Sequence, residues 1–361
     1  MLAYIYFKDF SGATVPFTEN YVPTKRFTWD FSLSSSSLGP SPQVRQALMQ
    51  ALSDNDALSP YPDAGYPELV KAIANFHHVD FDNIILGAGL DGLIFDSINA
   101  LLGPNDELVI PAVTFRNALY AAASKGAVVK QVPMQATLAV DFEQLIKTIG
   151  ANTKVVFLCN PNNPTGLYEP LVSIRRLLES TTALVIVDEA NIEFTGGESA
   201  LSLVEQFPHL MVLRTFSKAY GLAGIRVGYG ISRSPLLKKI ASDRPPFFIS
   251  KLSEIAACHA FADQDYMHHA VASIIQERSF LECELKNLGF TVTPSRSNTV
   301  LCRIPQGVSS ASYVIEQLNK YDVNVVNGTH FNLEDRYLRI SPKLREANEN
   351  MLQVLKHILG I

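Results

Sequence analysis

The sequence is poor in charge: only 18% of its 361 residues are charged, whereas 47% are hydrophobic. This balance excludes an intrinsically disordered chain, which combines low hydrophobicity with high net charge. The net charge is −5 and no long basic run occurs, so nucleic acids and anionic membranes are poor partners. No apolar run reaches the length of a membrane-spanning helix. We therefore expect a globular protein that binds neither nucleic acid nor membrane.

Cysteine is scarce, and its spacing matches neither a metal site nor a disulfide framework. We expect reduced, mostly buried thiols in a cytoplasmic protein. Residues 1–10 have no basic region followed by a long apolar one, so they do not predict a signal peptide. The adjacent histidines at 77–78 and 268–269 cannot share one helix face, and we expect them to be solvated rather than to bind metal. The four cysteines are Cys159, Cys258, Cys283 and Cys302.

The length predicts two domains, because a single core rarely serves so many residues. From residue 83 onward, apolar runs of strand length alternate with helix-length segments, which predicts a mainly parallel sheet covered on both faces. The predicted strands are 84–86, 107–110, 127–132, 154–158, 184–187, 210–213 and 226–231, and the helices are 90–102, 115–124, 141–149, 171–180 and 201–207. The last strand follows too short a connection for a crossover helix, so an antiparallel pairing is expected.

Outside this region the pattern changes. Residues 1–40 read as an irregular arm, and helices are predicted at 43–52, where Ser41 is a candidate N-cap, and at 67–76. After a helix stop at 244–247, the pattern predicts a smaller α+β domain. Its helices are expected at 251–262, 266–288, 310–321 and 344–359, and its strands at 290–292, 299–304, 323–326 and 337–340. The predicted division is a large domain at 41–250 and a small domain from 251–361 together with the arm 1–40.

One stretch, residues 212–232, carries a lysine that is suited to covalent chemistry. Lys218 follows an apolar strand and lies close to Thr215 and Ser217, with Arg226 eight positions further on. An amine in this setting can form a Schiff base with a carbonyl, while the hydroxyls and the guanidinium hold a phosphate. An exposed loop lysine is the plainer alternative, so the interpretation depends on the rest of the chain.

Two further stretches follow the first two predicted strands of the sheet. Residues 87–92, Gly-Ala-Gly-Leu-Asp-Gly, open a helix whose N-terminal N–H groups favour an anion such as phosphate, although similar turns occur without ligands. Phe115 opens the next helix, where its ring is placed either to stack on a planar ligand or to pack in the core.

The remaining two stretches follow the predicted strands 154–158 and 184–187. Residues 160–166, Asn-Pro-Asn-Asn-Pro-Thr-Gly, form a rigid loop from which the Asn163 amide can reach a ligand oxygen; an Asx-type turn is the alternative. Asp188 ends a wholly apolar strand, so its carboxylate needs a cationic partner. A protonated pyridine nitrogen and an ordinary buried ion pair are both possible partners.

Taken together and in this order, these stretches resemble the fold type I pyridoxal-phosphate enzymes, in particular the histidinol-phosphate aminotransferase-like branch. The matching motifs are N-P-N-N-P-T-G, D-E-A, R-T-F-S-K-A-Y-G-L-A-G-I-R and the late Y-L-R-I-S, and the likeness spans nearly the whole chain. The resemblance implies a three-layer α/β large domain with a mainly parallel seven-stranded sheet, and pyridoxal 5′-phosphate as the cofactor.

The resemblance also implies roles for individual residues. Lys218 would form the Schiff base with the cofactor and move the proton between substrate Cα and cofactor C4′, and Asp188 would pair with the pyridine nitrogen. Asn163 would donate to the ring oxygen O3′ and Phe115 would stack on the ring. The phosphate would be held by Gly89, Leu90, Asp91, Thr215, Ser217 and Arg226. Arg339 would bind the substrate α-carboxylate through a two-pronged contact. Tyr61 would reach the cofactor phosphate of a second subunit, which makes a homodimer the active unit.

Three positions depart from the family pattern. Asn191 replaces the tyrosine of the D-E-A-Y motif, which normally donates to O3′, so Asn191 is expected to line the cofactor site with a different chemistry. The N-E-N-P motif near the N-terminus is absent, and residues 34–37, all serine, occupy its place. Gly92 lies where the family has an acid.

The sequence therefore predicts an aminotransferase of amino-acid biosynthesis that acts on an amino acid or amino phosphate with a keto acid, by ping-pong kinetics. A decarboxylase that resembles threonine-phosphate decarboxylase, or another lyase or oxidase on the same fold, is the alternative that Asn191 and the serine run motivate. Release of carbon dioxide or ammonia without an acceptor would distinguish it. A third hypothesis, a cofactor-binding protein without turnover, predicts no spectral response to any amine.

Overall fold

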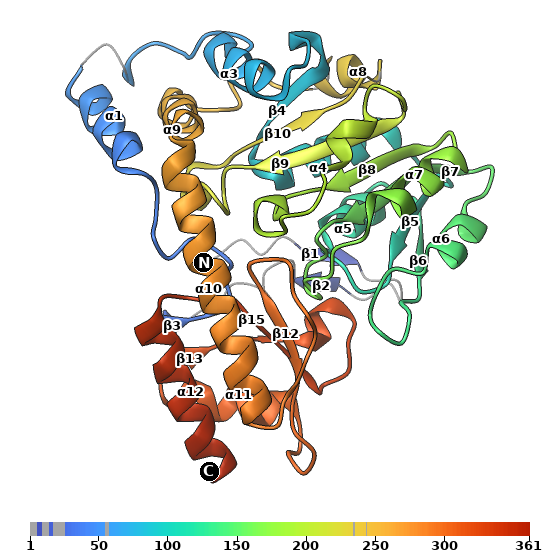
Figure 1. The fold of residues 1–361 in the computed structure, drawn as a ribbon. Coiled ribbons are helices and arrows are strands. Elements are labelled where there is room, and N and C mark those ends of the chain that lie inside the picture. Colours follow the sequence, from blue (N-terminus) through green and yellow to red (C-terminus); the bar gives the residue numbers. More distant parts are fainter. Residues whose placement is uncertain (1–5, 9–13, 17–25, 55–57, 234, 243) are drawn as a thin grey trace.

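The computed structural model describes residues 6–8, 14–16, 26–54, 58–233, 235–242 and 244–361 (Figure 1). Its α-helices are α1 (Pro42–Ser53), α3 (Pro67–His77), α4 (Gly89–Leu101), α5 (Asn117–Ser124), α6 (Phe142–Thr148), α7 (Leu171–Glu179), α8 (Leu236–Ser242), α9 (Lys251–Ala262), α10 (Gln264–Asn287), α11 (Ala311–Lys320) and α12 (Arg345–Leu359). Its strands are β1 (Tyr6–Lys8), β2 (Thr14–Pro16), β3 (Trp29–Asp30), β4 (Ile84–Ala88), β5 (Glu107–Pro111), β6 (Val128–Val132), β7 (Thr153–Cys159), β8 (Leu184–Asp188), β9 (Leu210–Thr215), β10 (Val227–Ile231), β11 (Thr291–Val292), β12 (Val300–Arg303), β13 (Val323–Asn324), β14 (Val326–Asn327) and β15 (Tyr337–Ile340).

The larger sheet has seven strands in the order β4-β10-β9-β8-β7-β5-β6. The pairs among β5 to β9 are parallel, while β10 is antiparallel to both of its neighbours, β4 and β9. This confirms the predicted mainly parallel sheet and its one antiparallel strand. Because β4 runs in the same direction as β9, the carboxyl ends of all strands except β10 lie at one edge of the sheet.

Both faces of this sheet are covered, because its central strands are apolar on both sides. Along β7, Val156 and Leu158 belong to one core cluster, whereas Val155 and Phe157 belong to the other. Helices α3, α6, α7 and α9 supply the first cluster, and α4, α5 and α8 supply the second, which gives the expected three layers. Each fully buried aliphatic side chain contributes about 1.5–3 kcal/mol relative to an exposed one.

A second sheet has the order β11-β12-β15-β14, and all of its pairs are antiparallel. Helices α10, α11 and α12 pack with it around a third core cluster. Helix α10 joins the two regions: Met267 and Ile274 lie in the core of the large sheet, whereas Leu281 and Leu285 lie in that of the small sheet (Figure 1). This continuous helix fixes the small sheet relative to the strand ends of the large one.

Residues 29–41 lead from the small-sheet region to the first helix of the large-sheet region. Strand β3 pairs parallel with β13, and the chain then continues to α1, which Ser41 caps as predicted by accepting a hydrogen bond from the Val44 N–H. The prediction of an irregular arm at 1–40 is confirmed for residues 26–28 and 31–40, which form neither helix nor strand. It is wrong at β1, β2 and β3, because β1 pairs with β2 and β3 pairs with β13. The rest of that prediction falls on residues 1–5, 9–13 and 17–25, which lie outside the described residues.

Other elements differ from the sequence prediction. The expected helix at 201–207 is a short 3₁₀ helix, Ala200–Leu203, because the Glu189 carboxylate accepts the Ala200 N–H and holds the start of this segment in place. The expected strand at 323–326 divides into β13 and β14, which belong to different sheets. Helix α8 was not predicted.

The expected solvation of the histidine pair at 77–78 is wrong for His77. Its Nε2 lies 2.9 Å from the Tyr229 hydroxyl, and its ring packs near Phe261. Burial, followed by the charges of Arg214 and His78, lowers the pKa of His77 to about 4. Within the described ranges no cluster of potential metal ligands occurs, and no helix there has both the length and the hydrophobicity of a membrane span.

The cysteines are all free, but fewer of them are buried than expected. Cys159 and Cys302 are buried, Cys258 is partly exposed and Cys283 is exposed.

Candidate active site

A cavity of about 370 Å³ lies at the carboxyl edge of the large sheet. This is where a parallel α/β sheet places its ligands, because the loops that follow successive strands converge there. Ten of the residues singled out from the sequence line it together: Leu90, Asp91, Phe115, Asn163, Asp188, Asn191, Thr215, Ser217, Lys218 and Arg226. Gly89 adjoins them at the start of α4. The strand ends thus bring Leu90 and Arg226, which are 136 residues apart in the sequence, into one site.

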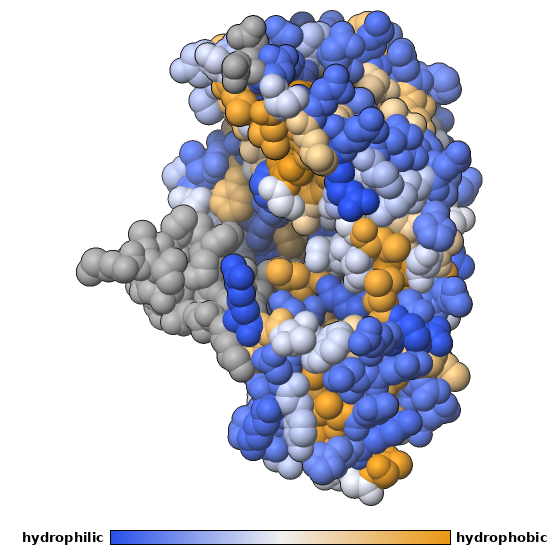
Figure 2. All heavy atoms as spheres, turned by 90° about the vertical axis from the view of Figure 1, so that its left-hand side faces the viewer, coloured by the Kyte–Doolittle hydropathy of each residue, from blue (hydrophilic) through white to orange (hydrophobic). Residues whose placement is uncertain are grey.

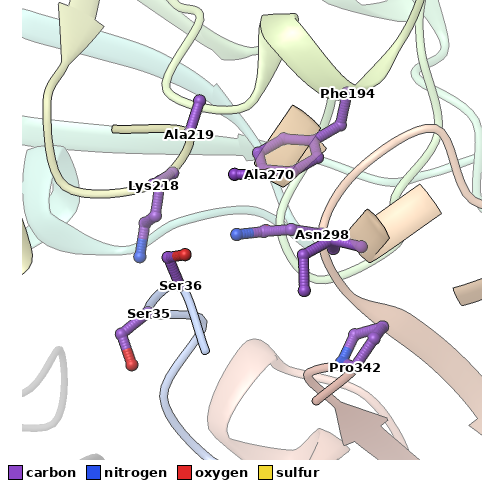
Figure 3. A pocket seen from close by; sticks show the side chains of 9 residues that line it. Ser35, Ser36, Phe194, Lys218, Ala219, Ala270, Asn298 and Pro342 are labelled. Carbon is purple, nitrogen blue, oxygen red and sulfur yellow. The ribbon is translucent and has the colours of Figure 1, made fainter. Parts of the chain in front are cut away.

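Lys218 follows β9 and points away from the sheet. Its Nζ donates a hydrogen bond to Ser34 Oγ at 2.8 Å, so the N-terminal segment reaches the reactive amine. Figure 3 shows the Lys218 side chain extending toward the segment that carries Ser35 and Ser36, with Asn298 beside it. The sequence had marked this serine run only as a departure from a motif.

Asp188 is the last residue of β8 and is 3% exposed. Its Oδ1 accepts a hydrogen bond from the Ala190 N–H at 2.9 Å. Burial raises the pKa of Asp188 to about 7, against the opposing effects of that hydrogen bond and of the Lys218 charge. A cation placed at this carboxylate would restore its ionisation, which is the property that the pyridine nitrogen of the implied cofactor offers.

Two buried amides face the same cavity. Within the described part of the chain, Oδ1 of Asn163 and Oδ1 of Asn191 have no hydrogen-bond partner. The loop that carries Asn163 is held by Asn162, whose Nδ2 donates to the Val113 carbonyl and to Thr165 Oγ1. A buried polar atom without a partner is uncommon in folded proteins, so the pair of amides indicates a site built for a polar ligand.

The candidate phosphate cradle lies where α4 begins. Gly89 has a φ of +73°, and a Cβ at this position would lie 2.8 Å from Arg226 Cζ, so only glycine allows the guanidinium to approach. Arg226 Nη2 donates to Asp91 Oδ2 at 2.9 Å, and Thr215 Oγ1 donates to Ser217 Oγ at 3.0 Å. Hydroxyls, a guanidinium and a helix N-terminus therefore adjoin one end of the cavity, a donor set that fits a phosphate.

Besides Gly89, two predicted residues lie outside the lining of this cavity. Arg339 on β15 is fully buried, donates from Nη2 to the Ser32 carbonyl, and has its guanidinium 5.5 Å from the centre of the Phe331 ring. Arg339 is therefore not a surface arginine. Tyr61 is 80% exposed and stacks on Phe247.

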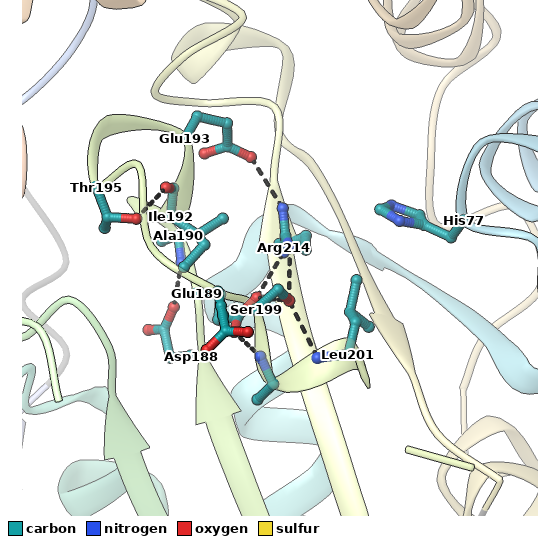
Figure 4. Close-up of polar contacts among 12 residues, drawn as sticks. His77, Asp188, Glu189, Ala190, Ile192, Glu193, Thr195, Ser199, Leu201 and Arg214 are labelled. Carbon is teal, nitrogen blue, oxygen red and sulfur yellow. Dashed lines mark hydrogen bonds and ion pairs between the residues drawn. The ribbon is translucent and has the colours of Figure 1, made fainter. Parts of the chain in front are cut away.

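The sequence missed the network that supports the strand ends. Glu189, next to Asp188, accepts hydrogen bonds from Arg214 Nε at 2.9 Å and from the Ser199 hydroxyl at 2.7 Å (Figure 4). Arg214 Nη1 also contacts Glu193 at 3.3 Å. The partners lie on different strands and loops, so a local sequence pattern cannot predict that they are in contact. The ordinary buried ion pair that was considered for Asp188 is formed instead by Glu189.

Comparisons with known proteins agree with this geometry. Residues 30–358 match the family model of class I and II aminotransferases. A histidinol-phosphate aminotransferase of Methanocella arvoryzae is 34% identical over 91% of this chain and 89% of its own, and one of Staphylococcus haemolyticus is 36% identical over 88% of each. The crystal structure of histidinol-phosphate aminotransferase from Sinorhizobium meliloti in complex with pyridoxal-5′-phosphate superposes with a TM-score of 0.84, at 26% identity over 93% of this chain and 92% of that one.

Proposed function

This chain belongs to the class I and II aminotransferases and uses pyridoxal 5′-phosphate, and from that premise we propose that it moves the amino group of an amino acid or amino phosphate to a keto acid. The observation that supports a working site best is the meeting of Lys218, Asp188 and Asn163 in one cavity at the strand ends. We infer ping-pong kinetics, since donor and acceptor would use the same amine and cavity in turn.

In this proposal most of the predicted residues in the cavity would hold one part of the cofactor. Asp188 would pair with the ring nitrogen, Asn163 and Asn191 would face the ring oxygen, and Phe115 would stack on the ring. The phosphate is held at the start of α4 and by the loop after β9, through Gly89, Leu90, Asp91, Thr215, Ser217 and Arg226. When bound, pyridoxal phosphate supplies a ring that withdraws electrons from the substrate Cα.

The protein supplies the proton transfer and the binding of the substrate. Lys218 Nζ would accept the proton from substrate Cα, hold it, and give it up again as the amino group is transferred. Arg339 binds the substrate α-carboxylate through its guanidinium, and its full burial supports this role because it makes a charge-assisted contact strong. The reverse order of the same steps aminates the keto acid.

The substrate is proposed from the relatives. Those at 34% and 36% identity are named histidinol-phosphate aminotransferases, so histidinol phosphate and other amino phosphates are the first candidates. The decarboxylase alternative is not favoured, because these relatives and the family model are aminotransferases.

We further propose a cytoplasmic homodimer with a large domain at 41–250 and a small domain formed by 1–40 and 251–361. The division is supported by the separate core of the small sheet. The dimer is supported by exposed apolar side chains near α1, and Figure 2 shows apolar residues gathered in the upper part of the face that carries this helix. The exposed apolar side chains on which this interface is proposed are Met49, Leu52, Leu58, Tyr61 and Phe247. In this dimer Tyr61 reaches the partner's cofactor phosphate. The cytoplasmic location is supported by four free thiols.

The test combines labelling with exchange. Protein loaded with pyridoxal phosphate and reduced with borohydride should carry the label on Lys218, as read by peptide mass spectrometry. Each of a panel of amino acids and amino phosphates should then be tested for isotope exchange with its own keto acid in the absence of a second substrate. A label elsewhere, or no exchange across the panel, would contradict the proposal.

A further inference from the structure

The serine run beside Lys218 begins with a buried residue, Ser34, that is held in place by hydrogen bonds. Ser34 is 5% exposed, and its Oγ accepts the hydrogen bond from Lys218 Nζ. Both residues line the large cavity. The hydroxyl therefore contacts the nitrogen that performs the proposed proton transfer.

Four consecutive backbone carbonyls hold this segment, and all of their donors come from the small-sheet region. The Ser341 N–H donates to the Phe31 carbonyl, Arg339 to the Ser32 carbonyl, Lys343 Nζ to the Leu33 carbonyl at 2.9 Å and Asn298 Nδ2 to the Ser34 carbonyl at 3.0 Å. Residues 31–34 are thus fixed in register, and the position of Ser34 Oγ follows from that register. The Ser34 hydroxyl is therefore preorganised for its contact with Lys218 Nζ.

We propose that Ser34 is a positioning residue of this aminotransferase, an inference that rests on the proposed transamination: its Oγ holds the Lys218 amine in the orientation from which that amine takes the proton of substrate Cα. Lys218 as a base has two N–H bonds and one lone pair. Donation of one N–H to Ser34 Oγ stops the free rotation about the Cε–Nζ bond. The direction in which the lone pair points is then fixed as well. The C–H bond of Cα breaks, its proton becomes the third N–H of Lys218, and its electron pair remains on the substrate and cofactor.

Ser37 offers a matched control in the same segment. Its Oγ is buried and, among the described residues, has no hydrogen-bond partner. Ser37→Ala therefore removes a hydroxyl of the same kind from the same serine run without removing a contact to Lys218. Ser34→Thr keeps the hydroxyl and serves as the conservative variant.

The first measurement uses cofactor-free protein, so that it does not depend on turnover. A limiting amount of acetic anhydride is added, and acetylation of Lys218 is compared with that of exposed Lys125 by peptide mass spectrometry. Ser34→Ala should raise the relative rate at Lys218 several-fold because the amine loses its hydrogen bond to Ser34 Oγ, while Ser37→Ala and Ser34→Thr should match the wild type. An unchanged rate in Ser34→Ala, or an equal rise in Ser37→Ala, would overturn the proposal.

The second measurement follows the loss of deuterium from substrate Cα to solvent in the loaded enzyme. Ser34→Ala should lower this rate about 10- to 100-fold, with KM within about twofold, and Ser34→Thr should restore most of it. A wild-type enzyme that exchanges no Cα hydrogen contradicts the proposed function, whereas the acetylation result still decides the contact of Ser34 with Lys218. Exchange by Ser34→Ala at the wild-type rate would overturn the role of Ser34 alone.

Discussion

Glu189 Oε2 accepts a hydrogen bond from Arg214 Nε at 2.9 Å, and this ion pair joins the ends of β8 and β9. The Glu189 side chain is fully buried and that of Arg214 is 11% exposed. Glu189 directly follows Asp188, and Arg214 lies four residues before Lys218. The pair therefore fixes the distance between the carboxylate and the amine on which the proposed chemistry depends.

Removal of one partner of this pair should destabilise the protein strongly, because the other charge is left buried. We expect Arg214→Met to lower the free energy of unfolding by about 3–5 kcal/mol, as measured by urea denaturation. Arg303→Met, which breaks an ion pair with Glu334 whose side chains are 50% and 70% exposed, should lower it by less than about 1 kcal/mol. Equal losses in the two variants would contradict the structural role of Glu189 and Arg214.

Asp188 should make the stability of the cofactor-free protein depend on pH. Its pKa is raised from 3.8 to about 7 by burial, so the folded state holds this proton more tightly than the unfolded state does. The resulting stabilisation is fully present below pH 3.8 and is lost as the pH rises to about 7. Relative to Asp188→Asn, the wild type should therefore lose up to about 4 kcal/mol of unfolding free energy as the pH rises over this range.

Bound cofactor should reverse the effect of the same substitution. With the ring nitrogen as a partner, the Asp188 carboxylate becomes favourable, so Asp188→Asn should lower turnover about 10²- to 10³-fold. Unfolding curves at several pH values, with and without pyridoxal phosphate, measure the effect on stability, and the isotope-exchange assay measures the effect on turnover. A pH-independent difference between the cofactor-free proteins would show that Asp188 is not held in its neutral form.

The sequence predicted those parts of the site that follow from local pattern. Asn163, Asp188 and Lys218 each come after an apolar run, and parallel strands bring the ends of such runs together. The contact between Ser34 and Lys218 could not be predicted in this way, since 184 residues separate them and a run of serines has no characteristic partner. It depends on donors from the small sheet.

The errors in the fold have a similar cause. The apolar residues near 201–207 fit a helix, but the Glu189 carboxylate binds the Ala200 N–H and favours a 3₁₀ turn. His77 was placed in solvent because its neighbour is also a histidine, whereas the Tyr229 hydroxyl lies beside its ring. In both cases a contact distant in sequence overrides the local preference.

His77 should affect stability over an acidic range of pH and with the opposite sign to Asp188. Its pKa is lowered to about 4, mainly by burial, so the unfolded chain takes up a proton near pH 6.5 that the folded protein resists. The contribution of neutral His77 is fully present above pH 6.5 and is lost as the pH falls to 4. Relative to His77→Gln, the wild type should lose up to about 3 kcal/mol between pH 7 and pH 4.

Denaturant midpoints at four or five pH values measure this difference. The variant loses ring packing against Phe261, but that loss is the same at every pH and leaves the slope unaffected. Parallel curves for the wild type and His77→Gln would contradict a buried neutral imidazole.

The proposed contribution of Tyr61 to the partner's site can be tested by complementation. Lys218→Ala and Tyr61→Ala homodimers should each be weakly active, because every site lacks either the amine or the phosphate contact. In a mixed dimer, one site combines Lys218 of the second variant with Tyr61 of the first and is complete. Equal amounts that are unfolded and refolded together should form such dimers for about half of the protein, which restores activity to about a quarter of all sites. Mixing without refolding is the control, and activity that stays at the level of the separate variants after refolding would show that Tyr61 does not act across an interface.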